Sequence, residues 1–142
     1  MTLKVFQILL IVLCVVMLFV GCQSQVAYDP DTVLTYRLKG VDVQVKLTED
    51  EAKLVAGLFN GKKIERWFNF DEWKLEYYEY GCPFDQNVTI DIGSMTYYIG
   101  YDGCGIVRIG EGEAVPYIEL TYEEDQQLVE LFRKYTGLER PY

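Results

Sequence analysis

The cysteines are the residues of this chain best suited to covalent chemistry. The sequence has four of them, at positions 14, 22, 82 and 104, and it has no histidine. A thiol can be acylated, can pair with another thiol or can bind a metal ion, but the absence of histidine removes the commonest transition-metal ligand and the commonest general base. No two cysteines form a C-x-x-C motif, so a redox-active dithiol is not expected. Acylation and pairing are therefore the reactions to consider.

Cys22 ends an N-terminal segment that has the order of an export signal. Lys4 supplies one positive charge, an apolar run from Val5 to Val20 contains a single polar residue, and Gly21 is the small residue before the cysteine. A run of this length would form roughly 24 Å of helix, which is shorter than a hydrocarbon core of about 30 Å. The segment therefore predicts a secretory leader rather than a membrane-spanning helix.

Residues 1–22 resemble the leaders of bacterial lipoproteins that are processed by the lipoprotein signal peptidase. The resemblance rests on Phe19-Val20-Gly21-Cys22, in which Phe19 stands where such leaders most often carry Leu. It implies a signal peptide over residues 1–21, cleavage before Cys22, and lipidation of its sulfur with fatty-acyl chains such as palmitate. The mature protein would then be anchored to the cell membrane on its extracytoplasmic side, because two or three acyl chains hold a protein stably. The alternative is an uncleaved signal anchor with an incidental cysteine.

Removal of the leader would leave 121 residues, which is enough for one compact domain. The leader contains Lys4 and no acidic residue, so the net charge changes from −9 to −10. Such a surface repels phosphate backbones, and we expect no nucleic-acid partner. A protein, peptide or glycan partner is compatible with this charge.

Two cysteines are left once Cys14 is discarded with the leader and Cys22 carries the lipid. Cys82 and Cys104 form an even pair in an oxidising compartment, which favours a structural disulfide. The sequence between them predicts a β-hairpin turning at Gly93-Ser94. In the register that puts all apolar residues on one face, the cross-strand pairs are Ile92 with Met95, Ile90 with Tyr97, and Val88 with Ile99. The two cysteines would meet at the open end of this hairpin.

Two helices are predicted by the same N-terminal signal. Thr48-x-x-Glu51 and Thr121-x-x-Glu124 are capping boxes, and each is followed by apolar residues at helical spacing. Asn60-Gly61 and Gly137 are the expected ends of the two helices. Each helix follows directly on a predicted strand, so a strand and a capped helix occur twice. The two copies indicate either an internal duplication or two separate uses of one common structural motif.

We expect residues 22–31 to be the lipidated cysteine and a short polar tether, and residues 32–142 to be a single α+β domain. Alternating apolar residues predict strands, which are Leu34 to Leu38, Val41 to Leu47, Val88 to Ile92, Met95 to Ile99, Ile106 to Ile109 and Val115 to Leu120. The stretch from Ile64 to Tyr80 indicates irregular chain followed by a strand. The prediction is an antiparallel sheet of about five to seven strands with two helices packed against it.

The mature part resembles small uncharacterised lipoproteins of Gram-positive bacteria. The motifs that carry this resemblance are Cys82-Pro83-Phe84-Asp85, Asp102-Gly103-Cys104 and Phe132-Arg133-Lys134-Tyr135. It implies no activity, cofactor or site.

We expect a lipid-anchored binding or interaction module that is not an enzyme, and the sequence indicates no catalytic residue, cofactor or metal site. The alternative is a small envelope enzyme that uses carboxylates, for instance on glycans. Its candidate residues are the acids that stand near aromatic residues, namely Asp71, Glu72, Glu76, Glu79 and Asp85. Aromatic residues at alternating positions are expected to fill the core and the others to cover a sheet face.

Overall fold

The computed structural model describes Gln7 and residues 23–67, 88–100, 105–110 and 115–137. These residues form seven strands and two helices, in the order β1 (Val33–Leu38), β2 (Val41–Lys46), α2 (Glu49–Phe59), β3 (Glu65–Trp67), β4 (Thr89–Ile92), β5 (Met95–Ile99), β6 (Ile106–Ile109), β7 (Val115–Glu119) and α4 (Tyr122–Thr136). The predicted α+β fold is confirmed.

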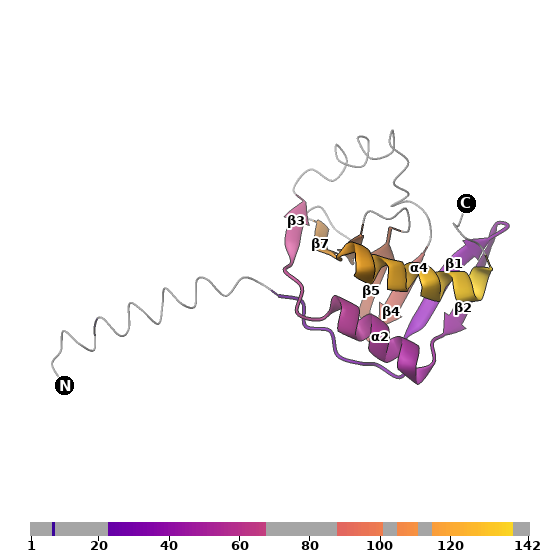
Figure 1. Ribbon diagram of the computed structural model, residues 1–142, viewed down its shortest axis with the longest axis horizontal. Helices are drawn as coiled ribbons and strands as arrows, with labels where there is room; N and C mark the ends of the chain where they lie inside the picture. Colours follow the sequence, from indigo (N-terminus) through magenta and orange to yellow (C-terminus); the bar gives the residue numbers. More distant parts are fainter. Residues whose placement is uncertain (1–6, 8–22, 68–87, 101–104, 111–114, 138–142) are drawn as a thin grey trace.

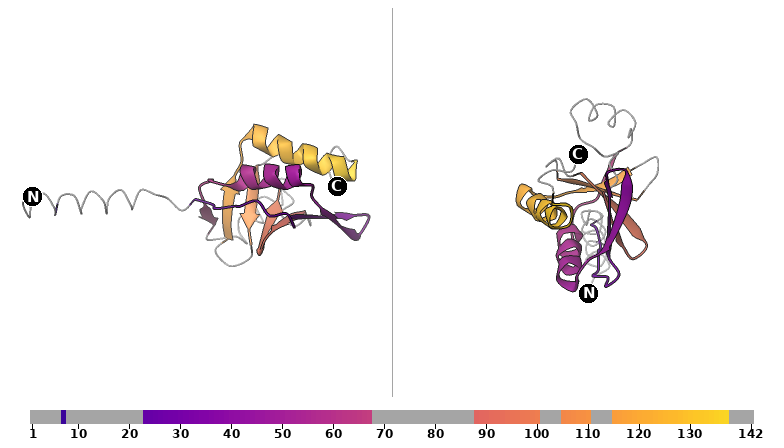
Figure 2. Two further views of the ribbon diagram at one scale, coloured as in Figure 1. Left: turned by 90° about the horizontal axis from the view of Figure 1, so that it is seen from below. Right: turned by 90° about the vertical axis from the view of Figure 1, so that its right-hand side faces the viewer.

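All seven strands belong to one antiparallel sheet with the order β2-β1-β4-β5-β6-β7-β3. Helices α2 and α4 lie side by side on one face of this sheet (Figures 1 and 2). The core lies between the two layers, and Phe59, Leu34, Ile90 and Ile118 are among its largest fully buried side chains. The strands β2 and β3 form the two edges of the sheet.

Two hairpins connect neighbouring strands, and the second has the register that the sequence predicted. In the first, Lys39 and Gly40 form the turn with φ angles of 52° and 80°, and Leu38 pairs with Val41. Positive φ at both central residues is typical of the type I′ turn, whose twist matches that of the flanking strands. In the second hairpin, Ile92 pairs with Met95 and Ile90 with Tyr97, as the apolar pattern predicted.

Both predicted capping boxes are present. The side chains of Thr48 and Thr121 accept from the backbone N–H of Glu51 and Glu124, and these glutamates accept in return from the backbone N–H of the two threonines. The apolar residues that follow at helical spacing face the sheet and are buried, namely Val55, Leu58 and Phe59 in α2 and Leu128, Leu131 and Phe132 in α4. The strand followed by a capped helix therefore occurs twice, as β2–α2 and β7–α4.

The strand β3 was not predicted. The sequence indicated irregular chain after Ile64, but Glu65–Trp67 pair with β7 and extend the sheet by one strand. A strand of three residues is too short to show an alternation of apolar and polar side chains. Residues 68–80, where a strand was expected instead, lie outside the described residues.

Candidate functional site at the junction behind Cys22

The residues singled out for covalent or acid–base chemistry fall in parts of the chain that the structure does not describe. These are Cys22, Cys82, Cys104 and the carboxylates Asp71, Glu72, Glu76, Glu79 and Asp85. Lipidation, the disulfide and the carboxylate site therefore stay predictions. The structure does describe the residue that follows Cys22 and everything from there to Trp67.

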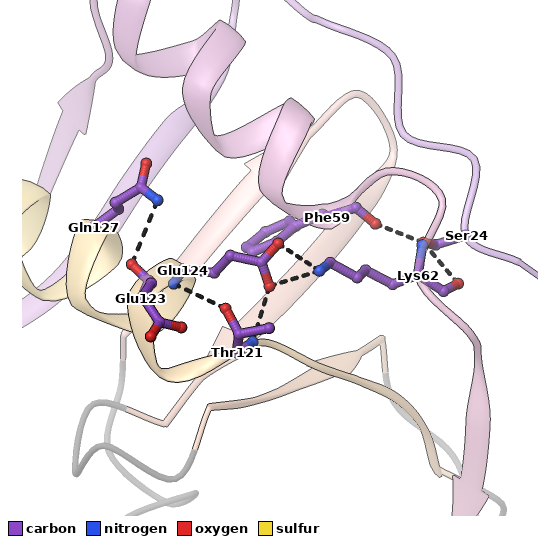
Figure 3. A network of polar contacts seen from close by, with 7 residues as sticks. All are labelled: Ser24, Phe59, Lys62, Thr121, Glu123, Glu124 and Gln127. Carbon is purple, nitrogen blue, oxygen red and sulfur yellow. Dashed lines mark hydrogen bonds and ion pairs between the residues drawn. The ribbon is translucent and has the colours of Figure 1, made fainter.

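Ser24, two residues after Cys22, is integrated into the fold. Its side chain is buried, and the residue is only 4% exposed. The hydroxyl donates to the carbonyl oxygen of Phe59 at 2.5 Å and accepts from the N–H of Lys62 at 2.9 Å. Its own N–H donates to the carbonyl of Lys62 at 2.7 Å, and its carbonyl accepts from the N–H of Gly61 at 2.8 Å. Ser24 thus closes the loop after α2 through both its backbone and its side chain (Figure 3).

The neighbours of Ser24 are held to the same loop. Gln23 forms an isolated antiparallel bridge with Lys63, at the start of the chain that leads into β3. The N–H of Val26 donates to the side-chain oxygen of Asn60 at 3.0 Å, and the Val26 side chain belongs to the hydrophobic core. The part of the expected tether that begins at Gln23 is consequently docked on the domain. Its sequence is polar, and nothing in that composition indicated docking.

An ion pair connects this loop to the second helix. The ammonium of Lys62 lies 2.6 Å from both carboxylate oxygens of Glu124, and Oε2 of this carboxylate also accepts from the N–H of Thr121 at 2.8 Å. The hydrogen bond from Lys62, and then that from the Thr121 backbone, lower the pKa of Glu124 below its usual value. About three quarters of each side chain is shielded from solvent, with 22% and 25% exposed. The cap of α4 is therefore also a fixed point for the loop that holds Ser24.

The opposite end of the helix pair has an equivalent connection. Glu51, which caps α2, accepts from the ammonium of Lys134 and from the hydroxyl of Tyr135, both at 2.6 Å. Burial raises the pKa of Glu51, but the hydrogen bonds from Lys134, Tyr135 and Thr48 outweigh it and hold that pKa at about 2. Burial, together with the bond to Glu51, raises the pKa of Tyr135 to about 12.

The two connections are made from equivalent positions of the repeated strand and capped helix. Lys62 follows Thr48 by 14 residues, and Tyr135 follows Thr121 by the same number. Each therefore occupies the same position in its own unit and binds the capping glutamate of the other. This reciprocal arrangement fixes the antiparallel helices at both ends. Sequence reasoning missed it, because the partners are 62 and 84 residues apart.

The face of the sheet opposite the helices carries aromatic and basic side chains. The register places Arg108 between Tyr98 and Tyr117 on neighbouring strands. The guanidinium of Arg108 lies 3.9 Å from the centre of the Tyr98 ring, within the range of a cation–π contact. Tyr97, one residue before Tyr98, is buried in the core instead. The tyrosines of β5 therefore divide between the two faces, as their alternation predicted.

A small cavity and a larger open groove are among the concavities of the described residues. The cavity lies between the sheet and α4, has a volume of about 10 Å³, and is lined by apolar side chains and by Asp125. This volume fits about one water molecule. The groove, of about 420 Å³, runs over the outer surface of α2 and α4 past Leu54 and Glu130. Small-molecule sites are usually enclosed and exceed about 300 Å³, so neither concavity has the form of such a site.

The described part of the chain also bears on metal binding and on membrane crossing. Within it, no three acidic or cysteine side chains gather closely enough to hold a metal ion. No helix among these residues combines the length and the apolar character needed to cross a bilayer. No family model matches the sequence, and the comparisons with curated proteins and with solved structures also found no match.

Proposed function

We propose that this protein is a lipid-anchored interaction module on the extracytoplasmic side of the cell membrane, and that it acts without catalysis. Cys22 would be the first residue of the mature chain and would carry the lipid. The module would present its surface to a protein, peptide or glycan of the envelope.

One observation supports this proposal more than any other. The residues directly after Cys22 belong to the domain, since Gln23 pairs with Lys63 and Ser24 is buried. A segment that cleavage removes is not expected to contribute to the fold, whereas the first residues of a mature chain can do so. The docking of Gln23 and Ser24 therefore supports a mature chain that starts at Cys22.

The shape of the described surface supports a contact role. Its enclosed cavity has room for about one water molecule, while its larger concavity is an open groove over two helices. Surfaces of the second kind suit contact with a macromolecule better than turnover of a small substrate. The net charge of −10 of the mature chain favours cationic or neutral partners over nucleic acid.

Metabolic labelling with a radioactive fatty acid tests the proposal. The wild-type chain should incorporate label and fractionate with membranes, and Cys22→Ala should incorporate none and persist as a longer precursor. Cys14→Ala is the matched control, because Cys14 lies in the same leader and should leave labelling unchanged. Equal label in the wild type and in Cys22→Ala would contradict the proposal and favour an uncleaved signal anchor.

A further inference from the structure

The distance between the anchor and the domain is set by the docking of residues 23–26. A free tether over residues 23–31 would reach about 30 Å when extended. In the structure the bridge between Gln23 and Lys63 leaves no free residue between Cys22 and the fold, so the available reach is about 3.5 Å. A lipid on Cys22 would therefore hold the domain directly at the surface of the bilayer.

The docked segment is fixed to the domain at several points. The chain is held at Gln23 by pairing with Lys63, at Ser24 by backbone and side-chain hydrogen bonds to the loop after α2, and at Val26 by Asn60. Ser24 and Val26 are buried. The loop itself is fixed to α4 through Lys62 and Glu124. The freedom of the attachment is therefore confined to the bonds of Cys22 and its lipid.

The docked segment lies at one edge of the sheet. Gln23 pairs with Lys63, two residues before β3 begins, and the β1–β2 hairpin lies at the opposite end of the sheet (Figure 1). Six strand spacings of about 4.8 Å separate β3 from β2, so the two edges lie about 29 Å apart. Val41, the first residue of β2 after the turn, is 64% exposed.

The charges near the anchor agree with contact to lipid headgroups. Lys62, Lys63 and Arg66 lie within five consecutive positions beside the docked segment, and the ion pairs of Lys62 with Glu124 and of Lys63 with Glu65 leave this part of an otherwise strongly acidic chain with only a small excess of positive charge. Basic residues at a membrane surface are attracted by anionic headgroups, and an acidic body is repelled by them. The two effects favour the same orientation.

We infer that the lipid anchor holds the domain in one orientation, with the β3 edge and the loop after α2 against the headgroups of the bilayer and the β1–β2 hairpin directed away from it. This inference rests on the proposed lipidation of Cys22. It identifies the lipid surface as the partner of the β3 edge, and it leaves the outer edge of β2 as the part of the sheet presented to the envelope.

Energy transfer from a fluorophore on the protein to acceptor lipids tests the orientation. The lipidated chain would be recovered from membranes and reconstituted in vesicles of phosphatidylcholine and phosphatidylglycerol. Donors would be attached to Lys63→Cys at the near edge and to Lys39→Cys at the far turn, with the parent chain as the labelling blank. With the two edges about 29 Å apart, transfer from position 63 should be clearly stronger than transfer from position 39.

A linker variant provides the control. Insertion of a flexible Gly/Ser segment between Cys22 and Gln23 leaves the docked contacts intact but frees the domain from its anchor, so the difference between the two positions should shrink. Equal transfer from both positions in the lipidated parent chain would overturn the inference while the proposed function stands. Absence of lipid on the recovered chain would contradict the proposed function, and the inference with it.

Discussion

Ser24 shows how one small polar residue can hold a segment of chain to a domain. Its hydroxyl both donates and accepts, so a single buried group satisfies the carbonyl of Phe59 and the N–H of Lys62. These two groups stand at and just beyond the end of α2, where helix geometry leaves carbonyl groups without intrahelical partners. The residue thus closes the end of the helix as well as docking the chain that follows Cys22.

Replacing Ser24 tests this role. Ser24→Ala leaves the buried N–H of Lys62 without its acceptor, and such a loss costs about 1–3 kcal/mol. We expect urea denaturation to show a decrease of that size in the free energy of unfolding. Gln25→Ala is the control, because Gln25 is exposed and should change the stability by less than about 0.5 kcal/mol. Equal effects of the two substitutions would show that the docked segment does not stabilise the domain.

The lowered pKa of Glu51 predicts that the stability of the domain falls at acid pH. A glutamate titrates near 4.5 when unfolded, and the fold lowers the pKa of Glu51 to about 2. A lowered pKa means that the stabilising contribution is complete above about pH 4.5 and is lost as the pH falls toward 2. Between these pH values, the melting temperature should therefore fall further in the wild type than in Glu51→Gln. Asp50→Asn, which removes an exposed carboxylate on the same turn, should retain the wild-type profile.

The contribution of Tyr135 to stability should have the opposite pH dependence, because it is lost in alkali. Its pKa is raised to about 12 from 10 in the fold, so its contribution is complete below about pH 10 and is lost as the pH rises through 12. Tyr135→Phe should remove this part of the alkaline loss. A wild-type melting temperature that falls no more than that of Tyr135→Phe over this range would contradict the contact with Glu51.

Among the secondary-structure elements, local sequence patterns predicted those that are determined by interactions between residues close in the sequence. The hairpin at Gly93-Ser94 followed from alternation and a turn dipeptide, and the two helix starts followed from Thr48 and Thr121 with their glutamates. The strand β3 could not be predicted, because it is three residues long and exists through its pairing with β7. The docking of Ser24 depends on a loop more than 30 residues away, which no local pattern reports.

The hairpin is also the basis for predicting the disulfide. Its register is confirmed as far as the hydrogen bond from the N–H of Ile99 to the carbonyl of Val88. In the sequence Cys82 precedes this hairpin and Cys104 follows it, so a bond between them would close the loop that contains β4 and β5. In the chain-entropy model such a bond stabilises a fold by about 3 kcal/mol. We expect the Cys82→Ser/Cys104→Ser double mutant to melt well below the wild type, and two free thiols in protein from the envelope would refute the bridge.

In the whole molecule, the proposed anchor would act together with the charge of the chain. Without residues 1–21 the net charge would be −10, and the basic residues beside the docked segment are in part neutralised by ion pairs, those of Lys62 with Glu124 and of Lys63 with Glu65. Without its lipid, the domain should therefore not bind DNA or anionic vesicles at about 0.15 M salt, where charges are screened beyond about 8 Å. Cosedimentation of residues 23–142 at micromolar concentration would measure this. Retention on either ligand would show a basic surface that the ion pairs do not neutralise.

The central claim is that the mature protein begins at a lipidated Cys22. Mass spectrometry of the chain isolated from membranes tests it most directly, because trypsin would release residues 22–37 as the N-terminal peptide. We expect this peptide to begin at Cys22 and to carry the mass of attached acyl chains. Alkaline hydrolysis would reduce that mass. A peptide in which Cys22 is unmodified, or is still joined to the apolar run before it, would contradict the account.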